Sequence, residues 1–456
     1  MSGTFSSLST ALSALQYNRV AMDVASSNIA NAATPGYARR QVVGQTTGAP
    51  SLPAIWSRWD GAGDGVQASP ITRMVDPLMD ARARTEHATG SFLDSRSTSL
   101  SRVETAIAEP GDNGVASALD AFKAAWQDVA NNPQDPAART QVLGKAQTLR
   151  DTITSQATAV DNEWSTQRTG LVADVAEVNQ VAGQLADLNR GLRSAYVGQT
   201  DAGTLLDQRD QLTQRLAELT GASVTINSDT TVDVSVAGQQ LVTGNTANAV
   251  TASGSSDLAG SGADPVTVQI NGAPVTLTTG QIGGRQQLLG TDLPGYMSSL
   301  DGVVASLTAS VNSQHQNGVD LDGAAGGDFW SGTSAETLQI AITDPRKIAA
   351  ADPTLGGLDN SNAAAMAGLD MGASSYRSLV TSFGVSVSSA QQGSTNQATL
   401  IAQVDASRQS LSGVNQDEEM VNLLAAQRGY EGAARVLTAM DSMLDTLIHN
   451  TGLVGR

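Results

Sequence analysis

The chain has 456 residues and carries 44 acidic and 26 basic side chains, for a formal net charge of −18 at pH 7. An acidic chain without a run of Lys or Arg is not expected to bind nucleic acid or an anionic membrane, since both partners require clustered positive charge. The absence of cysteine excludes disulfides, thiolate catalysis and cysteine-based zinc sites. No apolar run approaches the roughly 20 residues that cross a bilayer, so membrane insertion is not expected.

The chain begins with a long predicted helix. Its apolar side chains recur every seven residues or lie directly beside that repeat: Leu8, Leu12, Leu15, Met22 and Ile29. A narrow stripe of this period is typical of a coiled-coil seam, and an ordinary core helix is the alternative that periodicity alone leaves open. The helix is expected to stop near Asn31, because Pro35 disfavours the helical conformation at Thr34 and Gly36 allows a turn.

A connector at residues 41–64 is rich in Gly and Pro and is interpreted as short strands and turns. Seven-residue or three-and-four spacing of apolar residues then predicts four helices, at residues 76–109, 115–130, 136–196 and 205–219. Pro136 suits the first turn of the third of these helices, and Gly221 suits the end of the fourth. These residues are therefore predicted to form an elongated helical bundle.

From residue 221 to residue 286 the apolar period becomes alternating. Alternation predicts strands at residues 224–226, 232–236, 266–270 and 275–277. Asn271 and Gly272 indicate a hairpin turn between the last two strands. A stretch rich in Ser, Gly and Ala at residues 246–264 is interpreted as a loop. Residues 221–286 are therefore predicted to form a small β-rich domain.

Helices return at residues 293–317 and again from residue 363. The last predicted helix, residues 415–450, carries a second apolar stripe that repeats every seven residues: Leu423, Tyr430, Leu437, Met440, Leu444 and Leu447. This stripe matches the first one, so the two terminal helices are predicted to pair as a coiled coil.

The predicted fold class is mainly α with a smaller inserted β-rich domain, since a chain of this length exceeds a single core. The predicted units are a terminal coiled-coil domain, a connector, a helical bundle and an outer β-rich domain. Their ranges are 1–40 plus 408–456, 41–64, 65–220 plus 287–407, and 221–286, respectively.

Two short motifs at the end of the first helix resemble a known family. They are the run from Ser27 to Asn31 and the group Thr34, Pro35, Gly36 and Tyr37. This signature is similar to that of the bacterial flagellar axial proteins, which form the rod, the hook and the hook-filament junction. In that family the N-terminal helix pairs with a C-terminal helix of the same chain to form the inner tube of a hollow filament. The resemblance implies that the two apolar stripes are assembly interfaces.

Three internal stretches resemble the hook-associated branch of that family, at residues 206–212, 311–329 and 412–420. The resemblance implies a structural protein without a cofactor, which joins copies of itself in a ring at the distal end of the hook. It also implies three partners: the hook protein, a second junction protein next to the filament, and a cytoplasmic export chaperone at the C-terminal helix. The implied location is extracellular, at the hook-filament junction, after secretion by type III export.

Two other functions are compatible with the terminal helices. The first is another flagellar axial protein of the hook or rod, which the stretches at residues 206–212 and 311–329 argue against. The second is a signalling coiled-coil protein, whose Ala- and Ser-rich heptads look similar. That class needs a membrane anchor and a continuous helical hairpin, and neither is predicted here.

No catalytic, cofactor or metal site is predicted. His87, His315 and His449 lie in unrelated stretches, so they do not form a metal-binding pair on one helix. The run that begins at Asp320 faintly resembles a calcium loop but lacks its later acidic ligands, and is interpreted as a turn. The acidic residues 417–419 are expected to cap the last helix, with an intersubunit salt bridge as the alternative.

Overall fold

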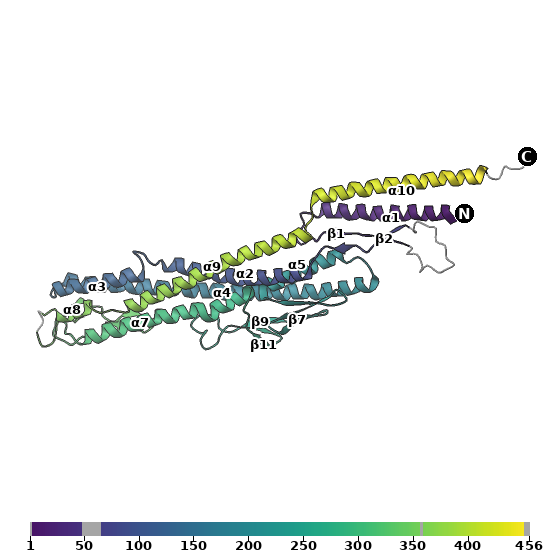
Figure 1. Cartoon of the computed structure of the whole chain (residues 1–456). Helices are drawn as coiled ribbons and strands as arrows, with labels where there is room; N and C mark the ends of the chain where they lie inside the picture. Colours follow the sequence, from purple (N-terminus) through teal and green to yellow (C-terminus); the bar gives the residue numbers. More distant parts are fainter. Residues whose placement is uncertain (1, 48–64, 356–358, 451–456) are drawn as a thin grey trace, which may run out of the picture.

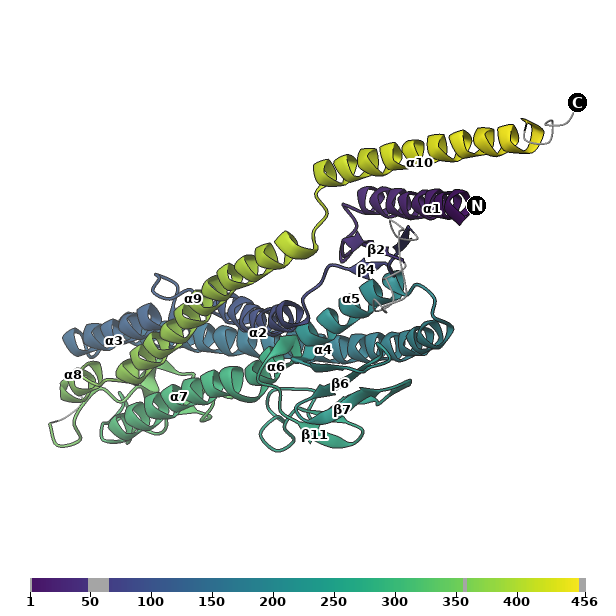
Figure 2. The ribbon, with the colours of Figure 1, turned by 45° about the vertical axis from the view of Figure 1, so that its right-hand side comes forward.

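The computed structural model describes residues 2–47, 65–355 and 359–450, and it shows an elongated molecule built from long helices (Figure 1). The first helix, α1 (Ser2–Ala30), and the last, α10 (Gln416–Asn450), lie side by side at one end. In the turned view of Figure 2 this pair stands apart from the other helices. The predicted pairing of the terminal helices is therefore confirmed.

Four helices follow close to their predicted ranges: α2 (Pro77–Ile107), α3 (Val115–Asn131), α4 (Pro136–Gly198) and α5 (Gly203–Thr220). Asp76 and Asp135 precede α2 and α4, and each side chain accepts a hydrogen bond of 2.8 Å from a backbone N–H in the first turn. Each Asp is followed by a Pro, whose missing N–H costs nothing at that position. Gly221 ends α5 with a positive φ of 70°.

Helix α4 carries the core of the bundle. It is 63 residues long, which corresponds to about 95 Å. Its fully buried side chains follow the predicted spacing of three and four: Val142, Ala146, Leu149, Ile153, Ala157, Val160, Trp164, Leu171, Val178, Ala182, Leu185 and Leu192. Helices α2, α3, α5 and α7 (Leu293–Gln316) pack against it. The elongated bundle is thus confirmed.

The β-rich region forms two small antiparallel sheets beside α4 (Figure 2). The four-stranded sheet has the order β5 (Ser223–Ile226), β6 (Val232–Val236), β7 (Gln239–Thr243), β8 (Thr246–Ala247). The three-stranded sheet has the order β11 (Ala273–Val275), β10 (Thr267–Ile270), β9 (Val250–Ser253). The hairpin at Asn271 and Gly272 is confirmed. The loop predicted at residues 246–264 is wrong in its first part, which forms β8 and β9.

This β-rich region is not free-standing, because its buried face shares one continuous core with α4. Two Asn side chains of α4 also bond strand backbones. Asn179 donates to the carbonyl of Val250 and accepts from its N–H, both at 2.8 Å. Asn189 does the same with Val232, at 2.8 and 3.0 Å. The sheets are therefore held on the helix by both apolar burial and hydrogen bonds.

A short helix that was not predicted, α6 (Gly280–Gln287), lies within the predicted β-rich domain except for its last residue. It packs against α2, and it continues through a π-helical turn at Leu288–Asp292 into α7. A Cβ at Gly284 would lie 2.7 Å from the carbonyl oxygen of Phe92, so the close contact between α6 and α2 requires glycine there. The indole N–H of Trp164 donates to the carbonyl of Leu289 within the π turn, at 3.1 Å.

The far end of the bundle holds a group of aromatic rings, Phe122, Trp126, His315, Phe329 and Trp330, whose centroids lie 5.3 to 6.3 Å apart. The strands β12 (Trp330–Ser331) and β13 (Gln339–Ile340), a 3-10 turn at Pro345–Lys347 and α8 (Ser361–Ala367) lie around it. Helix α9 (Ala373–Ser412) then runs back along α2 to the terminal pair.

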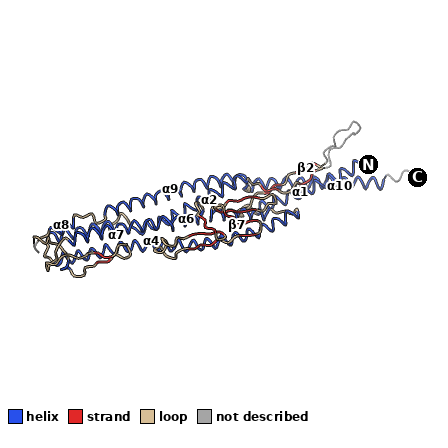
Figure 3. The backbone as a smooth tube through the Cα atoms, turned by 90° about the horizontal axis from the view of Figure 1, so that it is seen from below, coloured by secondary structure: helices blue, strands red, loops and turns tan. Residues whose placement is uncertain are grey.

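Four short strands form an arm between the terminal pair and the bundle (Figure 3). Strand β1 (Arg40–Gln41) pairs with β4 (Thr72–Arg73), and β2 (Gly44–Thr46) pairs with β3 (Val66–Ala68). We call residues 38–47 and 65–75 the arm. The predicted connector spans 41–64, and its residues 48–64 lie outside the described part of the chain.

Candidate assembly interface

The buried face of α1 is shifted from the predicted stripe. Its most buried side chains are small or polar: Ala11, Ala25 and Asn28. The predicted residues Leu8, Leu15, Met22 and Ile29 are only half-buried, and Leu12 is 51% exposed. A Cβ at Gly429 of α10 would overlap the side chain of Asn18, so Gly429 makes room for that side chain between the two helices.

On α10 most of the predicted stripe faces α1. Leu423, Leu437, Met440 and Leu444 are half-buried, and Ala426 and Ala433 between them are buried. Tyr430 lies at the edge of this seam and is 40% exposed. The side chain of Leu447 lies outside those that the structure describes.

A second apolar face of α10 has no cover in the described chain, and we call it the open face. Its members follow intervals of three, four and seven residues: Val421, Ala425, Gly432, Val436, Ala439 and Met443. The three larger side chains are strongly exposed, at 65% for Val421, 49% for Val436 and 57% for Met443. The terminal pair therefore satisfies one apolar face of α10 and leaves another in solvent.

The end of α1 is joined to the start of α10 by four side chains that we call the clasp: Asn28, Tyr37, Arg39 and Glu419. Asn28 is fully buried. Its amide donates to Glu419 and to the carbonyl of Arg40, both at 2.9 Å. Its oxygen accepts from the hydroxyl of Tyr37 at 2.8 Å and from the N–H of Arg40 at 3.0 Å. The amide thus uses its full hydrogen-bonding capacity.

The clasp corrects the expectation for the acidic residues 417–419. Glu419 does not cap its own helix, because Asn415 accepts the first-turn hydrogen bonds of Asp417 and Glu418, at 3.0 and 3.4 Å. Glu419 is instead buried and paired with Arg39, whose Nε lies 2.8 Å and whose Nη2 lies 2.7 Å from Oε1. The Glu419 carboxylate of α10 is therefore bonded to Asn28 of α1 and to Arg39 of the arm, all within one chain.

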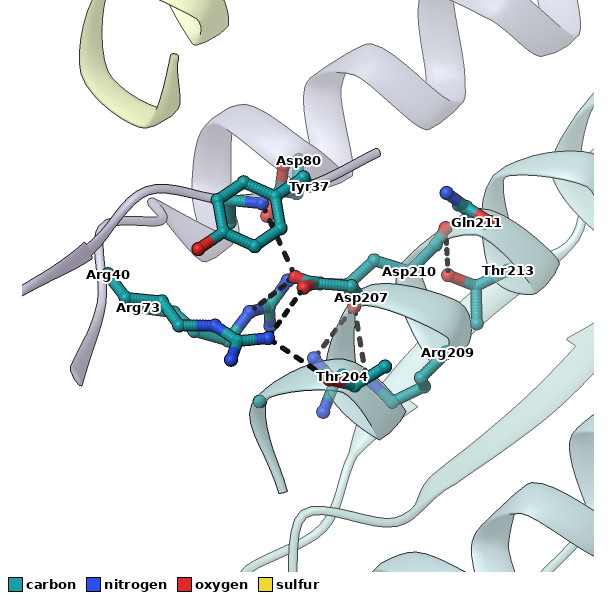
Figure 4. A network of polar contacts seen from close by, with 12 residues as sticks. Tyr37, Arg40, Arg73, Asp80, Thr204, Asp207, Arg209, Asp210, Gln211 and Thr213 are labelled. Carbon is teal, nitrogen blue, oxygen red and sulfur yellow. Dashed lines mark hydrogen bonds and ion pairs between the residues drawn. The ribbon is translucent and has the colours of Figure 1, made fainter. Parts of the chain in front are cut away.

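A second set of charges joins the arm to the bundle, and we call Arg40, Arg73, Asp207, Arg209 and Asp210 the ion-pair network. Figure 4 shows Asp207 receiving hydrogen bonds from both arm arginines. Arg73 Nη2 also bonds Asp210 at 2.7 Å. Arg209 pairs with the other oxygen of Asp210 at 2.7 Å. Both aspartates belong to the stretch 206–212 that resembles the family, so this motif forms a contact with the N-terminal arm.

The residues of the N-terminal motif have different roles. Gly36 has a positive φ of 76°, and a Cβ there would overlap the side-chain amide of Gln211. That amide donates to the carbonyl of Pro35. Tyr37 belongs to the clasp, and the guanidinium carbon of Arg40 lies 5.2 Å from the centroid of its ring.

The two remaining motif residues lie at the surface side of the turn. Asn31 donates to the carbonyl of Ser27 at 2.9 Å, which satisfies a free group at the helix end. Thr34 is exposed and donates to Asn31 at 3.3 Å.

The stretch 311–329 shapes the far end of the bundle. Asn312 accepts from the N–H groups of Phe329 and Trp330, at 2.9 and 2.8 Å. His315 is buried, with Nδ1 2.7 Å from the carbonyl of Gly327, while Nε2 accepts from the N–H of Ala349 at 2.9 Å. This pattern fits a neutral imidazole, and burial lowers the pKa of His315.

The run that begins at Asp320 forms a turn. The side chain of Asp320 accepts hydrogen bonds from the N–H groups of Asp322 and Ala324, both at 2.9 Å. Lys347 Nζ lies within 3.2 Å of the carboxylates of Asp320 and Asp322. Among the described residues no group of His, Asp and Glu side chains could hold a metal ion. Nor does any helix of the described chain have the length and hydropathy needed to cross a membrane.

Sequence reasoning identified the apolar stripe of α10 but not the residues that join the parts. The stretches containing Asn28 and Asp207 are indicated only by the resemblance, Glu419 is predicted as a helix cap, and no pattern indicates Arg40 or Arg73. A usable signal is the density of charge around residues 39–40, 73 and 207–210 in a chain with only 15% charged residues.

Comparison with protein families gives three matches along the chain. Residues 100–330 match the family described as flagellar hook-associated protein FlgK helical domain. Residues 8–37 match the flagella basal body rod protein family, and residues 407–450 match the C-terminal family of the flagellar basal body rod FlgEFG proteins. The two shorter matches coincide with α1 and its turn, and with the end of α9 followed by α10.

Whole-chain relatives and a solved structure agree with these matches. The chain is 28% identical to flagellar hook-associated protein 1 of Bacillus subtilis, over the full length of both chains. It is 25% identical to the protein of the same name from Escherichia coli, over 97% of this chain and 99% of the relative. The flagellar hook junction protein FlgK from Burkholderia pseudomallei has the same fold, with a TM-score of 0.66 at 16% identity, over 73% of this chain and 100% of that one.

Proposed function

Since the chain belongs to the family of flagellar hook-associated proteins FlgK, we propose that it is a structural adaptor of the bacterial flagellum. In this role it assembles as a ring on the distal end of the hook and connects the hook to the filament. The match over residues 100–330 supports this role over that of a rod or hook protein, because it covers the bundle rather than the terminal helices that axial proteins share.

The open face of α10 is the observation that carries this proposal. Three large apolar side chains, Val421, Val436 and Met443, lie in solvent on a helix whose other apolar face is already paired. Exposed apolar stripes of this kind bind another helix at positions three, four and seven residues apart. A second copy of the terminal pair offers such a helix. Assembly through the terminal helices then uses one face of α10 within the chain and the other between chains.

Three further partners belong to the proposal. The ring contacts the hook protein on one side and a second junction protein next to the filament on the other. Before export, a cytoplasmic chaperone binds α10 at the stripe from Leu423 to Leu447. Most of that stripe faces α1 in the folded chain, so the chaperone binds α10 while α1 is not paired with it. A chain cut after Gly413 is expected to lose the chaperone in a pull-down experiment.

The test is a charge placed on the open face in cells that lack the native chain. Val436→Asp is expected to leave hooks without filaments and to release filament subunits into the medium, because an aspartate cannot be buried between apolar helices without a large penalty. Electron microscopy of the hooks and immunoblots of the medium give the two measurements. Since Val436 is exposed, the purified variant should melt like the wild type.

Thr438→Asp is the matched control. It introduces the same charge two residues away, at an exposed position outside the open face, and is expected to leave filaments intact. Normal filaments in the Val436→Asp strain contradict the proposed interface. Equal loss of filaments in both strains shows an effect of charge on α10 as a whole and contradicts it as well.

A further inference from the structure

The junction between arm and bundle is built from charges rather than from an apolar core. From the arm to the bundle, the side-chain hydrogen bonds and ion pairs go to the first half of α5 and to Asp201 just before it. The N–H of Arg39 also donates to the carbonyl of Ser412 at the end of α9, at 2.9 Å. Buried apolar side chains of α5 begin only at Leu216, in its second half. The arm residues Val43 and Ile71 are exposed. Between the motif turn at residues 32–38 and the end of α9 lies an open pocket of about 440 Å³, which Arg73 also lines.

Asp207 lies at the centre of this contact. One carboxylate oxygen is 2.7 Å from Arg73 Nη2, and the other is 3.3 Å from Arg40 Nη2. The backbone N–H of Ala38 also points to it, at 3.4 Å. These three donors come from both strands of the β1–β4 pair and from Ala38, two residues before β1. Asp207 is therefore the point at which both chain segments of the arm meet the bundle.

The charges around Asp207 are buried, so each depends on its partners. Side-chain exposure is 10% for Asp207, 10% for Asp210 and 8% for Arg73. Removing one partner of a buried ion pair costs more than the pair itself contributes, because the remaining charge stays without compensation. Loss of the Asp207 charge leaves Arg73 and Arg209 sharing Asp210, and leaves Arg40 with Asp201 at 3.9 Å. Movement of the arm away from α5 lets Arg40 and Arg73 recover their hydration.

We propose that Asp207 is a positioning residue that sets the direction in which the arm and the terminal helices leave the bundle. Its charge holds the arm at one angle to α5. Without that charge the arm separates from α5, and the bundle stays folded because its apolar core lies elsewhere. This inference concerns the chain alone and holds whether or not the chain has the proposed role at the junction.

The test measures one distance across this contact in the full-length chain. Because the chain has no cysteine, Gln41→Cys on the arm and Gln184→Cys on α4 introduce two exposed labelling sites for nitroxides. Double electron–electron resonance is expected to give a single narrow distance distribution for the otherwise native chain. Asp207→Asn is expected to lose that narrow peak while the helical circular dichroism signal is retained. Asp207→Glu restores the carboxylate and is expected to restore the peak.

Two more variants complete the test. Arg40→Gln removes charge from the arm side, leaves α5 unchanged, and is expected to broaden the distribution as well. Asp187→Asn is the matched control, since Asp187 forms an exposed pair with Arg190 on α4, and it should keep the narrow peak. A narrow peak in both Asp207→Asn and Arg40→Gln overturns the assignment. So does loss of the peak in the control.

Discussion

Replacing Asn28 with Ala tests whether the clasp holds the end of α1 against the start of α10. The Asn28 side chain makes four hydrogen bonds of 2.8 to 3.0 Å in a fully buried position. Each contributes about 1 kcal/mol net, and a buried partner left unsatisfied adds to the cost. Two of the partners are the N–H and carbonyl of Arg40, which begin β1. We therefore expect Asn28→Ala to destabilise the clasp by about 3 kcal/mol.

Hydrogen exchange measured by mass spectrometry on the full-length chain is the assay. A loss of about 3 kcal/mol corresponds to about a hundredfold faster exchange at amides that open with the clasp. Peptides covering residues 24–30 and 38–42 should show this change, and peptides from the middle of α4 should not. The difference between the two regions separates opening of the clasp from unfolding of the bundle.

Asn31→Ala is the control, because it removes the same side chain three residues away. Within the described chain the Asn31 side chain bonds only Ser27 and Thr34 of its own turn, so its loss is expected to cost under about 1 kcal/mol. Equal exchange in the two variants would refute the reasoning. Free exchange of residues 24–30 in the wild-type chain would refute it too, since the clasp would then not be formed before assembly.

Three other predictions concern the motif turn, the β-rich region and the far end of the bundle. Gly36→Ala should lower the melting temperature, because alanine is strained by about 1 kcal/mol at positive φ and its Cβ overlaps the Gln211 amide. Deleting residues 223–277 should yield an aggregating chain in size-exclusion chromatography, since the deletion exposes the apolar face of α4. His315 has a pKa lowered by burial, so its contribution to stability is present above the unfolded pKa of about 6.5 and is lost as the pH falls through the folded value. Thermal melts between pH 7 and pH 5 should show that loss, and His315→Gln should reduce it.

Periodicity alone predicted the elements whose stability depends on apolar faces. The spacing of three and four along residues 136–196 predicted α4 almost to its ends, because a buried helix must present one apolar face over its whole length. Alternation predicted β6 for the same reason, since its three valines all face the core. The apolar stripe of α10 likewise predicted the seam with α1. In these elements a local pattern determines both the secondary structure and the buried side.

Elements that depend on neighbours were not predictable in this way. Helix α6 contains three glycines in eight residues and has low intrinsic helix propensity. It forms because its glycines allow close contact with its neighbours: Gly284 lies against α2, Gly280 against the end of α5, and Gly283 against Leu277. The sequence of β9 has the composition of a polar loop. It forms a strand because it pairs with β10 and because the Asn179 side chain bonds the backbone of Val250. On α1 the predicted leucine stripe is only half-buried, because the helix is rotated so that Ala11, Ala25 and Asn28 take the most buried positions, and periodicity does not determine that rotation.

The charged contacts of the assembly site were decided only by the tertiary structure. Asn28 and Glu419 are 391 positions apart, and Arg73 and Asp207 are 134 apart. The positions of these polar and charged residues follow no periodic pattern in the sequence, so the sequence does not indicate which of them will pair. In the unfolded chain each of these groups is hydrogen-bonded to water. Their partners are therefore determined by the path of α9, which returns the C-terminus to α1, and by the turn at Gly36, which brings the arm against α5. The apolar pattern specifies which helices form, and the fold specifies which charges meet.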